Sequence, residues 1–140
     1  MTVTVSEDHR LLIQAVRDYA RGELLALDVK WDRDESSCCE RLDQLYEMGL
    51  MGLRVPEDHG GLECPMVPYA HIIRELAYAS PSVAVTVSVH NMVCEAIKMF
   101  AGEAVRGDVQ RMLATPDNLS AFAISEPDAG SDPGAAKTRA

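Results

Sequence analysis

The residues best suited to chemistry lie near the end of the sequence, between positions 121 and 132. Ala121 to Ile124 are small or apolar and predict a buried strand, because the run has no polar face. Pro127 removes a backbone donor and ends the strand, and the glycine that follows tolerates a positive φ. Such a loop can turn backbone N–H groups and the Ser125 and Ser131 hydroxyls toward one point. This would suit an anionic or carbonyl-rich cofactor, although an ordinary exit from a strand into a turn explains the same residues.

The acidic side chains of this loop limit how it could bind a cofactor. Glu126, Asp128 and Asp132 would repel a pyrophosphate if they pointed toward it, so backbone N–H groups and hydroxyls must make the contacts. Glu126 could be considered as a catalytic base. A base that removes a proton has to face the cofactor across the substrate, whereas Glu126 lies in the cofactor loop itself.

Four motifs, in order along the chain, resemble those of acyl-CoA dehydrogenases. The loop is similar to the family's T/S-E-P-x-A-G-S-D motif, with Ser125 at its first position and Asp128 where glycine is common. Residues 48–62, MGLMGLRVPEDHGGL, resemble the G-L-x-G-L-x-V-P-E-x-x-G-G-L segment. The tripeptide that starts at Glu75 and the SVHN sequence at 88–91 fit at family-like distances. The resemblance extends over almost the whole chain.

The resemblance implies a flavin enzyme that oxidises acyl-CoA thioesters. In that family a carboxylate takes the α-proton, and the β-hydrogen leaves as a hydride to FAD, which gives a 2-enoyl-CoA. The electrons then pass to an acceptor flavoprotein. The family's catalytic glutamate lies in a C-terminal helical domain, so we expect no catalytic residue on this chain.

The resemblance also assigns cofactor-binding residues. Positions that match Phe122, Ile124 and Ser125 lie against the flavin ring in the family, where backbone and hydroxyl groups can bond its N5 and O4 edge. Positions that match Gly130 and Ser131 lie close to the cofactor and to the CoA part of the substrate. Ser131 is therefore also a candidate for substrate binding.

The SVHN sequence supplies two further candidates for substrate binding. The family's equivalent helix lines the acyl pocket, so Ser88 and Asn91 are expected to border the substrate. On a buried helix, His90 and Asn91 need hydrogen-bond partners, and a lone histidine is more often a core residue than a catalytic one. Ser88 and His90 do not form a hydrolase pair, because neither a nucleophile elbow nor an acidic partner is evident.

Helical periodicity organises the rest of the sequence. Apolar residues at three- and four-residue steps predict helices over residues 7 to about 31, 40–48, 66–78, 81 to about 100 and 103–113. The first helix is expected to begin after the N-cap Ser6 and to bury a stripe that includes Leu27. Glycines and prolines predict turns over 49–65 that cover Leu50, Met51, Leu53 and Val55.

Two segments can be interpreted in more than one way. Valines alternate from Val83 to Val89, which is a strand pattern, but Ser80 and Pro81 form a good N-cap and first helical position. We predict one long buried helix there, partly because of the family resemblance. Arg74 and Glu75 are read from composition as a solvated charged face.

The expected fold is mainly α. Residues 1–115 are interpreted as a helical bundle like the N-terminal domain of acyl-CoA dehydrogenases, and 116–140 as the first strand and flavin-binding loop of a truncated β domain. Family members are more than twice as long, and a strand without partners leaves backbone groups unpaired. We therefore interpret the chain as a fragment, split subunit or frameshifted product that neither turns over acyl-CoA nor binds flavin alone. A helical interaction module that has lost the chemistry is the main alternative.

Composition restricts the partners. A net charge of −9 argues against nucleic acid and against an anionic membrane surface. No targeting signal is visible and no apolar run approaches the length of a membrane span, so a cytoplasmic location is the default. A zinc site can be drawn from Cys38, Cys39, His59 and Cys64, but the spacing is unlike that of zinc ligands, and we predict no metal. Full-length relatives are dimers or tetramers, so a homo-oligomer is expected of the whole protein.

Overall fold

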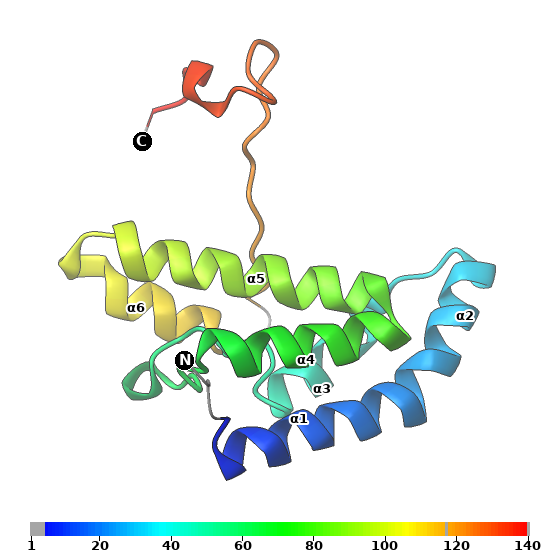
Figure 1. Ribbon diagram of the computed structural model, residues 1–140. Helices are drawn as coiled ribbons and strands as arrows, with labels where there is room; N and C mark the ends of the chain where they lie inside the picture. Colours follow the sequence, from blue (N-terminus) through cyan, green and yellow to red (C-terminus); the bar gives the residue numbers. More distant parts are fainter. Residues whose placement is uncertain (1–4, 117, 140) are drawn as a thin grey trace.

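Helices form the body of the protein in the computed structural model, which describes residues 5–116 and 118–139 (Figure 1). The α-helices are α1 (Glu7–Tyr19), α2 (Leu25–Asp34), α3 (Leu42–Glu47), α4 (Met66–Ala79), α5 (Pro81–Phe100) and α6 (Glu103–Leu113). Short 3₁₀ turns lie at Cys38–Arg41, Glu57–His59 and Pro133–Ala135. These positions confirm the helices predicted from periodicity and the mainly α fold class.

Helices α1 and α2 follow each other without a loop, because a π-helical turn at Ala20–Leu24 connects them. Helix α1 begins after Ser6, whose hydroxyl accepts a hydrogen bond from the His9 amide at 3.3 Å. A π turn holds an additional residue, so it shifts the buried face relative to an unbroken α-helix. The core therefore continues at Leu24 and Trp31, and the predicted stripe position Leu27 is only partly buried.

Helices α4 and α5 form an antiparallel pair that meets at Ser80 (Figure 1). The Ser80 hydroxyl accepts from the Val83 amide at 3.3 Å and donates to the Asp28 carboxylate of α2 at 2.6 Å. Pro81 occupies the first turn, where its missing N–H is not needed. The cap thus decides the ambiguous valine segment in favour of a helix, as we predicted.

The loop between α3 and α4 folds under the bundle as the glycine pattern predicts. Leu50, Met51, Leu53 and Val55 are all fully buried. Gly49 ends α3 with a φ of 72°, a conformation that favours glycine. A Cβ atom added to Gly61 would lie 2.1 Å from the Val55 carbonyl oxygen, so only glycine lets these two backbone segments approach so closely.

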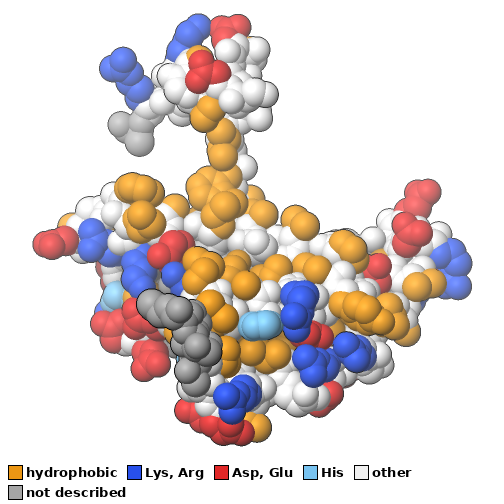
Figure 2. All heavy atoms as spheres, in the orientation of Figure 1, with side chains coloured by type: hydrophobic (Ala, Val, Ile, Leu, Met, Phe, Trp, Pro, Cys, Tyr) orange, Lys and Arg blue, Asp and Glu red, His pale blue; other side chains and the backbone are white. Residues whose placement is uncertain are grey.

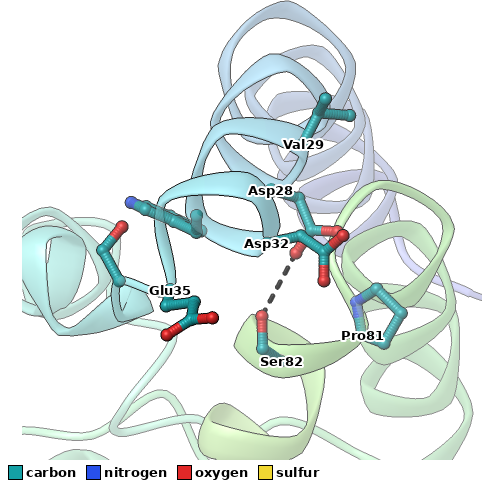
Figure 3. Close-up of a pocket in the computed structure, with 8 residues that line it drawn as sticks. Asp28, Val29, Asp32, Glu35, Pro81 and Ser82 are labelled. Carbon is teal, nitrogen blue, oxygen red and sulfur yellow. Dashed lines mark hydrogen bonds between the residues drawn. The ribbon is translucent and has the colours of Figure 1, made fainter.

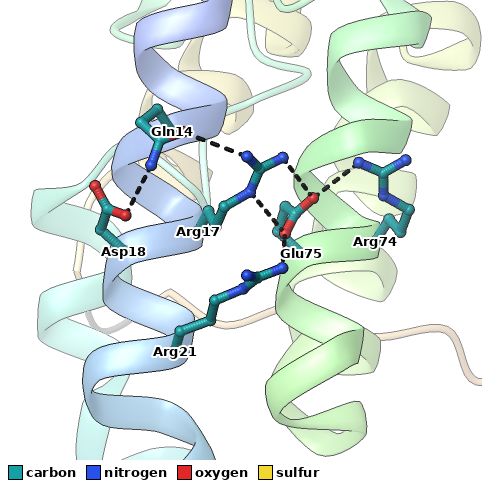
Figure 4. A network of polar contacts seen from close by, with 6 residues as sticks. All are labelled: Gln14, Arg17, Asp18, Arg21, Arg74 and Glu75. Carbon is teal, nitrogen blue, oxygen red and sulfur yellow. Dashed lines mark hydrogen bonds and ion pairs between the residues drawn. The ribbon is translucent and has the colours of Figure 1, made fainter.

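A buried carboxylate joins α1 to α4 (Figure 4). Glu75 is only 5% exposed and accepts hydrogen bonds from Arg17 at 3.2 Å and Arg74 at 2.8 Å. Arg21 lies 3.7 Å from the same carboxylate. Hydrogen bonds from Arg17 and then Arg74 lower the pKa of Glu75 to about 2. The interpretation of this pair as a solvated face is therefore wrong for Glu75.

Residues 118–132 leave the helical body as a narrow stalk (Figure 1). The predicted buried strand over 121–124 is wrong for the part of the chain that is described: the segment is extended, but it has no partner strand and its residues are exposed. A single antiparallel bridge joins Glu126 and Ala129 in the turn that follows. A strand is defined by its ladder, and within residues 5–116 and 118–139 no strand lies beside this segment to supply one.

Helix α5 is 20 residues long and has a mean hydropathy of 1.3 over its most apolar window. By length and composition alone it could cross a membrane, which corrects the expectation that no apolar run is that long. Its buried side includes His90 and Asn91, both hydrogen-bonded to neighbouring elements. Polar side chains matched to partners in this way are typical of a core helix in a helical bundle.

Candidate functional site

Ser120, at the base of the stalk, forms hydrogen bonds to the helical body. The Ser120 amide lies 3.2 Å and its hydroxyl 3.0 Å from Nδ1 of His90 on α5. Above this anchor, Phe122 is 42% and Ile124 53% exposed. Ser125, Gly130 and Ser131 are exposed as well. The five predicted cofactor residues thus share one solvent-accessible segment, and their contacts with a flavin stay a prediction.

The acidic side chains of the loop are engaged by the residues that follow it. The Glu126 carboxylate accepts hydrogen bonds from the amides of Lys137 and Thr138, both at 2.8 Å. Hydrogen bonds from Thr138, and then from Lys137, hold the pKa of Glu126 below its usual value. Asp128 pairs with the Lys137 ammonium group at 2.9 Å, and Asp132 accepts from the Gly134 amide at 3.2 Å. These carboxylates therefore have partners at the far end of the loop.

An apolar groove of about 320 Å³ lies between α4 and α5, on a face where apolar side chains gather (Figure 2). Its lining consists of Ile73, Ala77, Pro81, Ala84, Val85, Ser88 and Val89. A second hollow of about 210 Å³ shares Val85 and Val89 and reaches Leu119, Ser120 and Ala121. The two hollows form one apolar surface from the helix pair to the base of the stalk.

The two candidate substrate residues of α5 have different surroundings. Ser88 is half-buried and lines the apolar groove. Asn91 is fully buried: its amide nitrogen donates to the carbonyl oxygens of Leu50 at 2.8 Å and Val87 at 2.9 Å, and its Oδ1 accepts from the Arg54 amide at 2.9 Å. Asn91 thereby joins the buried loop to α5. Its predicted role beside a substrate stays a prediction.

A hollow of about 680 Å³ near the start of α5 was not anticipated from the sequence (Figure 3). Asp28, Asp32 and Glu35 give it an acidic lining, together with Val29, Trp31, Ser36, Pro81 and Ser82. The Asp28 carboxylate accepts from the Ser82 hydroxyl at 3.2 Å. This carboxylate thus serves to connect α2 with the start of α5.

Residues 5–116 and 118–139 include the four cysteines and the histidine that were considered for a zinc site. Within them no group of three or more His, Cys, Asp or Glu side chains could hold a metal ion. Cys38, Cys64 and Cys94 are buried, whereas Cys39 is exposed. Burial raises the pKa of Cys94 to about 12, which keeps this thiol protonated and unreactive at neutral pH.

Comparison with known proteins identifies the family. The sequence profile described as "Acyl-CoA dehydrogenase, N-terminal domain" matches residues 6–116. The chain belongs to the acyl-CoA dehydrogenase family. It is 33% identical over 137 residues to an acyl-CoA dehydrogenase of Bacillus subtilis and 30% identical over 140 residues to the human mitochondrial short-chain specific acyl-CoA dehydrogenase. The matches cover 97% and 99% of this chain but only 36% and 34% of those relatives, so the chain spans about a third of their length.

Solved structures support the same fold for this acyl-CoA dehydrogenase family member. Butyryl-CoA dehydrogenase of Megasphaera elsdenii superposes with a TM-score of 0.86 at 24% identity, over 99% of this chain and 37% of that chain. A chain from the structure of the electron-transferring flavoprotein of Acidaminococcus fermentans superposes with a TM-score of 0.84 at 25% identity, over 96% of this chain and 36% of that one. The helical body and the stalk therefore follow a known arrangement.

Proposed function

We propose that this chain is the N-terminal part of an FAD-dependent acyl-CoA dehydrogenase that converts an acyl-CoA thioester into a 2-enoyl-CoA. The observation that carries the proposal is the apolar surface that runs from the α4–α5 groove to Ser120, at the base of the stalk. A groove that ends where the motif segment begins can place an acyl chain beside a cofactor held by that segment. Ser88 would then border the acyl chain from α5.

The residues of the stalk fit a flavin in chemical character. Phe122 and Ile124 would pack against the ring, and Ser125 would hydrogen-bond to its edge, while Gly130 and Ser131 would lie near the cofactor and the CoA moiety. The fit is supported by the exposure of these residues and by the pairing of the acidic side chains with residues 134–138. Bound FAD would supply the hydride acceptor. Exposed apolar side chains and hydroxyl donors are what a largely apolar ring with a polar edge requires.

The carboxylate that takes the α-proton would lie outside this chain. Glu126 has a lowered pKa and its oxygens accept bonds from two backbone amides, so it is a poor acceptor for a further proton. The chain would therefore supply binding and orientation but not the base. An electron-transferring flavoprotein is the proposed acceptor, a choice supported by the structural match to the Acidaminococcus fermentans chain.

A chimera tests this proposal. Residues 1–140 would replace the matching third of the Bacillus subtilis relative, and the purified protein would be assayed for flavin absorbance and for oxidation of acyl-CoA with an artificial acceptor. We expect a yellow, active protein. Ser125→Ala should weaken flavin binding about fivefold to tenfold, because one hydrogen bond contributes about 1 kcal/mol.

Ser36→Ala is the matched control, because Ser36 is an exposed serine in the loop after α2. This variant should bind flavin as tightly as the unmodified chimera. A folded chimera that stays colourless at every flavin concentration would contradict the proposal and favour a helical interaction module that keeps the fold without the chemistry.

A further inference from the structure

The His90 side chain joins three elements in the core. It is fully buried on α5, its ring meets the Tyr46 ring of α3 edge-on at 5.9 Å, and its Nε2 lies 3.0 Å from the Leu113 carbonyl oxygen at the end of α6. On the opposite side of the ring, Nδ1 faces the amide and hydroxyl of Ser120. Each ring nitrogen therefore has a partner on a different segment.

The backbone partners fix the protonation state of this ring. A carbonyl oxygen can only accept a hydrogen bond, so Nε2 must carry the proton that is donated to Leu113. A backbone amide can only donate, so Nδ1 must present its lone pair to Ser120. The ring is thus neutral, with its single proton on Nε2. Burial, which lowers the pKa of His90, favours the same state.

Ser120 is the point at which this contact affects the motif segment. One residue further along, Ala121 begins the exposed run that contains Phe122, Ile124 and Ser125. Residues 121–125 make no hydrogen bond to the helical body among the described residues, so the direction of the stalk depends on its base. The Nδ1 contact is a directional constraint at that base, because it uses the backbone amide itself.

We infer that His90 is a positioning residue for the flavin segment: its Nδ1 holds the Ser120 amide and so fixes how residues 121–131 leave the helical body. This inference rests on the proposed function of that segment. The inference concerns only the hydrogen bond between His90 and Ser120, so it can be tested without flavin. Its failure is therefore distinguishable from a failure of flavin binding.

The experiment separates the two ring nitrogens. In His90→Asn the side-chain oxygen can take the place of Nδ1, whereas in His90→Gln the amide nitrogen can take the place of Nε2. Amide hydrogen exchange and ¹⁵N relaxation of residues 119–125 would be measured by NMR on the full 140-residue chain. The control is His71→Gln, at a half-buried histidine on α4.

We expect the Ser120 amide to exchange about tenfold faster in His90→Gln and within about threefold of wild type in His90→Asn, because only Asn preserves the acceptor. Residues 121–125 should gain mobility in the Gln variant alone. Equal acceleration in both variants, or none in either, would overturn the inference. If neither variant folds, wild type decides: a Ser120 amide protected about tenfold more than that of Phe122 supports the link, and equal exchange refutes it.

Discussion

Glu75 shows how one side chain can hold two helices together. Its side chain is 6% exposed, and three guanidinium groups, from α1, the π turn and α4, surround its carboxylate, so its negative charge is compensated although little water reaches it. Charge-assisted hydrogen bonds of this kind are stronger than neutral ones. The composition of α4 could not reveal the arrangement, because Arg17 lies 58 positions away in the sequence.

Glu75→Gln should lower the free energy of unfolding by about 2–3 kcal/mol, because Gln keeps the shape but brings an amide donor against the guanidinium donors. Chemical denaturation at neutral pH measures the change. Glu7→Gln is the control: this exposed residue pairs with Arg10 on the surface, so its loss should cost less than about 0.5 kcal/mol.

The same measurement as a function of pH provides a second test of the Glu75 pair. The pKa of Glu75 is lowered from 4.5 to about 2 in the folded protein, so the carboxylate stabilises the fold fully above pH 4.5 and loses this effect as the pH falls toward 2. The difference between wild type and Glu75→Gln should shrink over that range. A difference that does not change with pH would contradict the ion-pair explanation.

At the scale of elements, the close approach of two backbone segments in the loop before α4 depends on Gly61. Gly61→Ala should destabilise the protein by about 3 kcal/mol, because the new methyl group would meet backbone atoms of Val55 that cannot move aside. Thermal and chemical unfolding would measure this.

Gly22 supplies the matched control for that substitution. A Cβ atom at Gly22 meets nothing within 4 Å, and the residue lies inside a helix. Gly22→Ala should therefore be neutral or stabilise by up to about 1 kcal/mol. If both substitutions changed the free energy of unfolding equally, the close contact between residue 61 and Val55 would not explain the effect of Gly61→Ala.

The helices were predictable because their signals are local. Ser80 followed by Pro81 marks the start of α5, and apolar spacing marks α4 and α6. The π turn at Ala20–Leu24 was not predicted, because one inserted residue shifts the apolar spacing only in the residues that follow it. The segment over 121–124 was wrongly predicted as a buried strand, since apolar composition does not show whether a partner strand exists.

In the candidate site, too, some features could be predicted from the sequence and others could not. The motif from Phe122 to Ser131 was recognisable because its residues are contiguous in the sequence, and their role in binding a cofactor stays a prediction. The contact between His90 and Ser120 was not recognisable, because 30 positions separate the two residues and only the fold brings them together. The one available signal was that a buried histidine needs partners, which does not say which partners it finds.

At the scale of the whole molecule, most of the stability should reside in the helices. The main hydrophobic core draws its residues from the segment between Val16 and Val87, and the second cluster adds Val55, Cys94 and Leu113. Among residues 119–139, one side chain is buried, that of Ala129, within its own turn. The stalk is thus attached to the body without being part of its core.

Removal of residues 119–140 should leave cooperative unfolding intact and lower the free energy of unfolding by about 1–2 kcal/mol, because His90 loses the donors of Ser120. Circular dichroism during urea denaturation compares the shortened and full chains. A loss of more than about 4 kcal/mol would mean that the stalk stabilises the body in a way that these contacts do not explain.

The unpaired backbone groups of the stalk affect how the protein should behave in concentrated solution. The amides and carbonyls of residues 121–125 bond to no other described backbone group. In an extended chain, residues two positions apart, such as Phe122 and Ile124, share a face. Such a segment can form backbone hydrogen bonds with the same segment of a second copy, which would join two molecules through residues 121–125. The net charge of −9 on each copy opposes that encounter, so added salt should promote self-association by screening the repulsion.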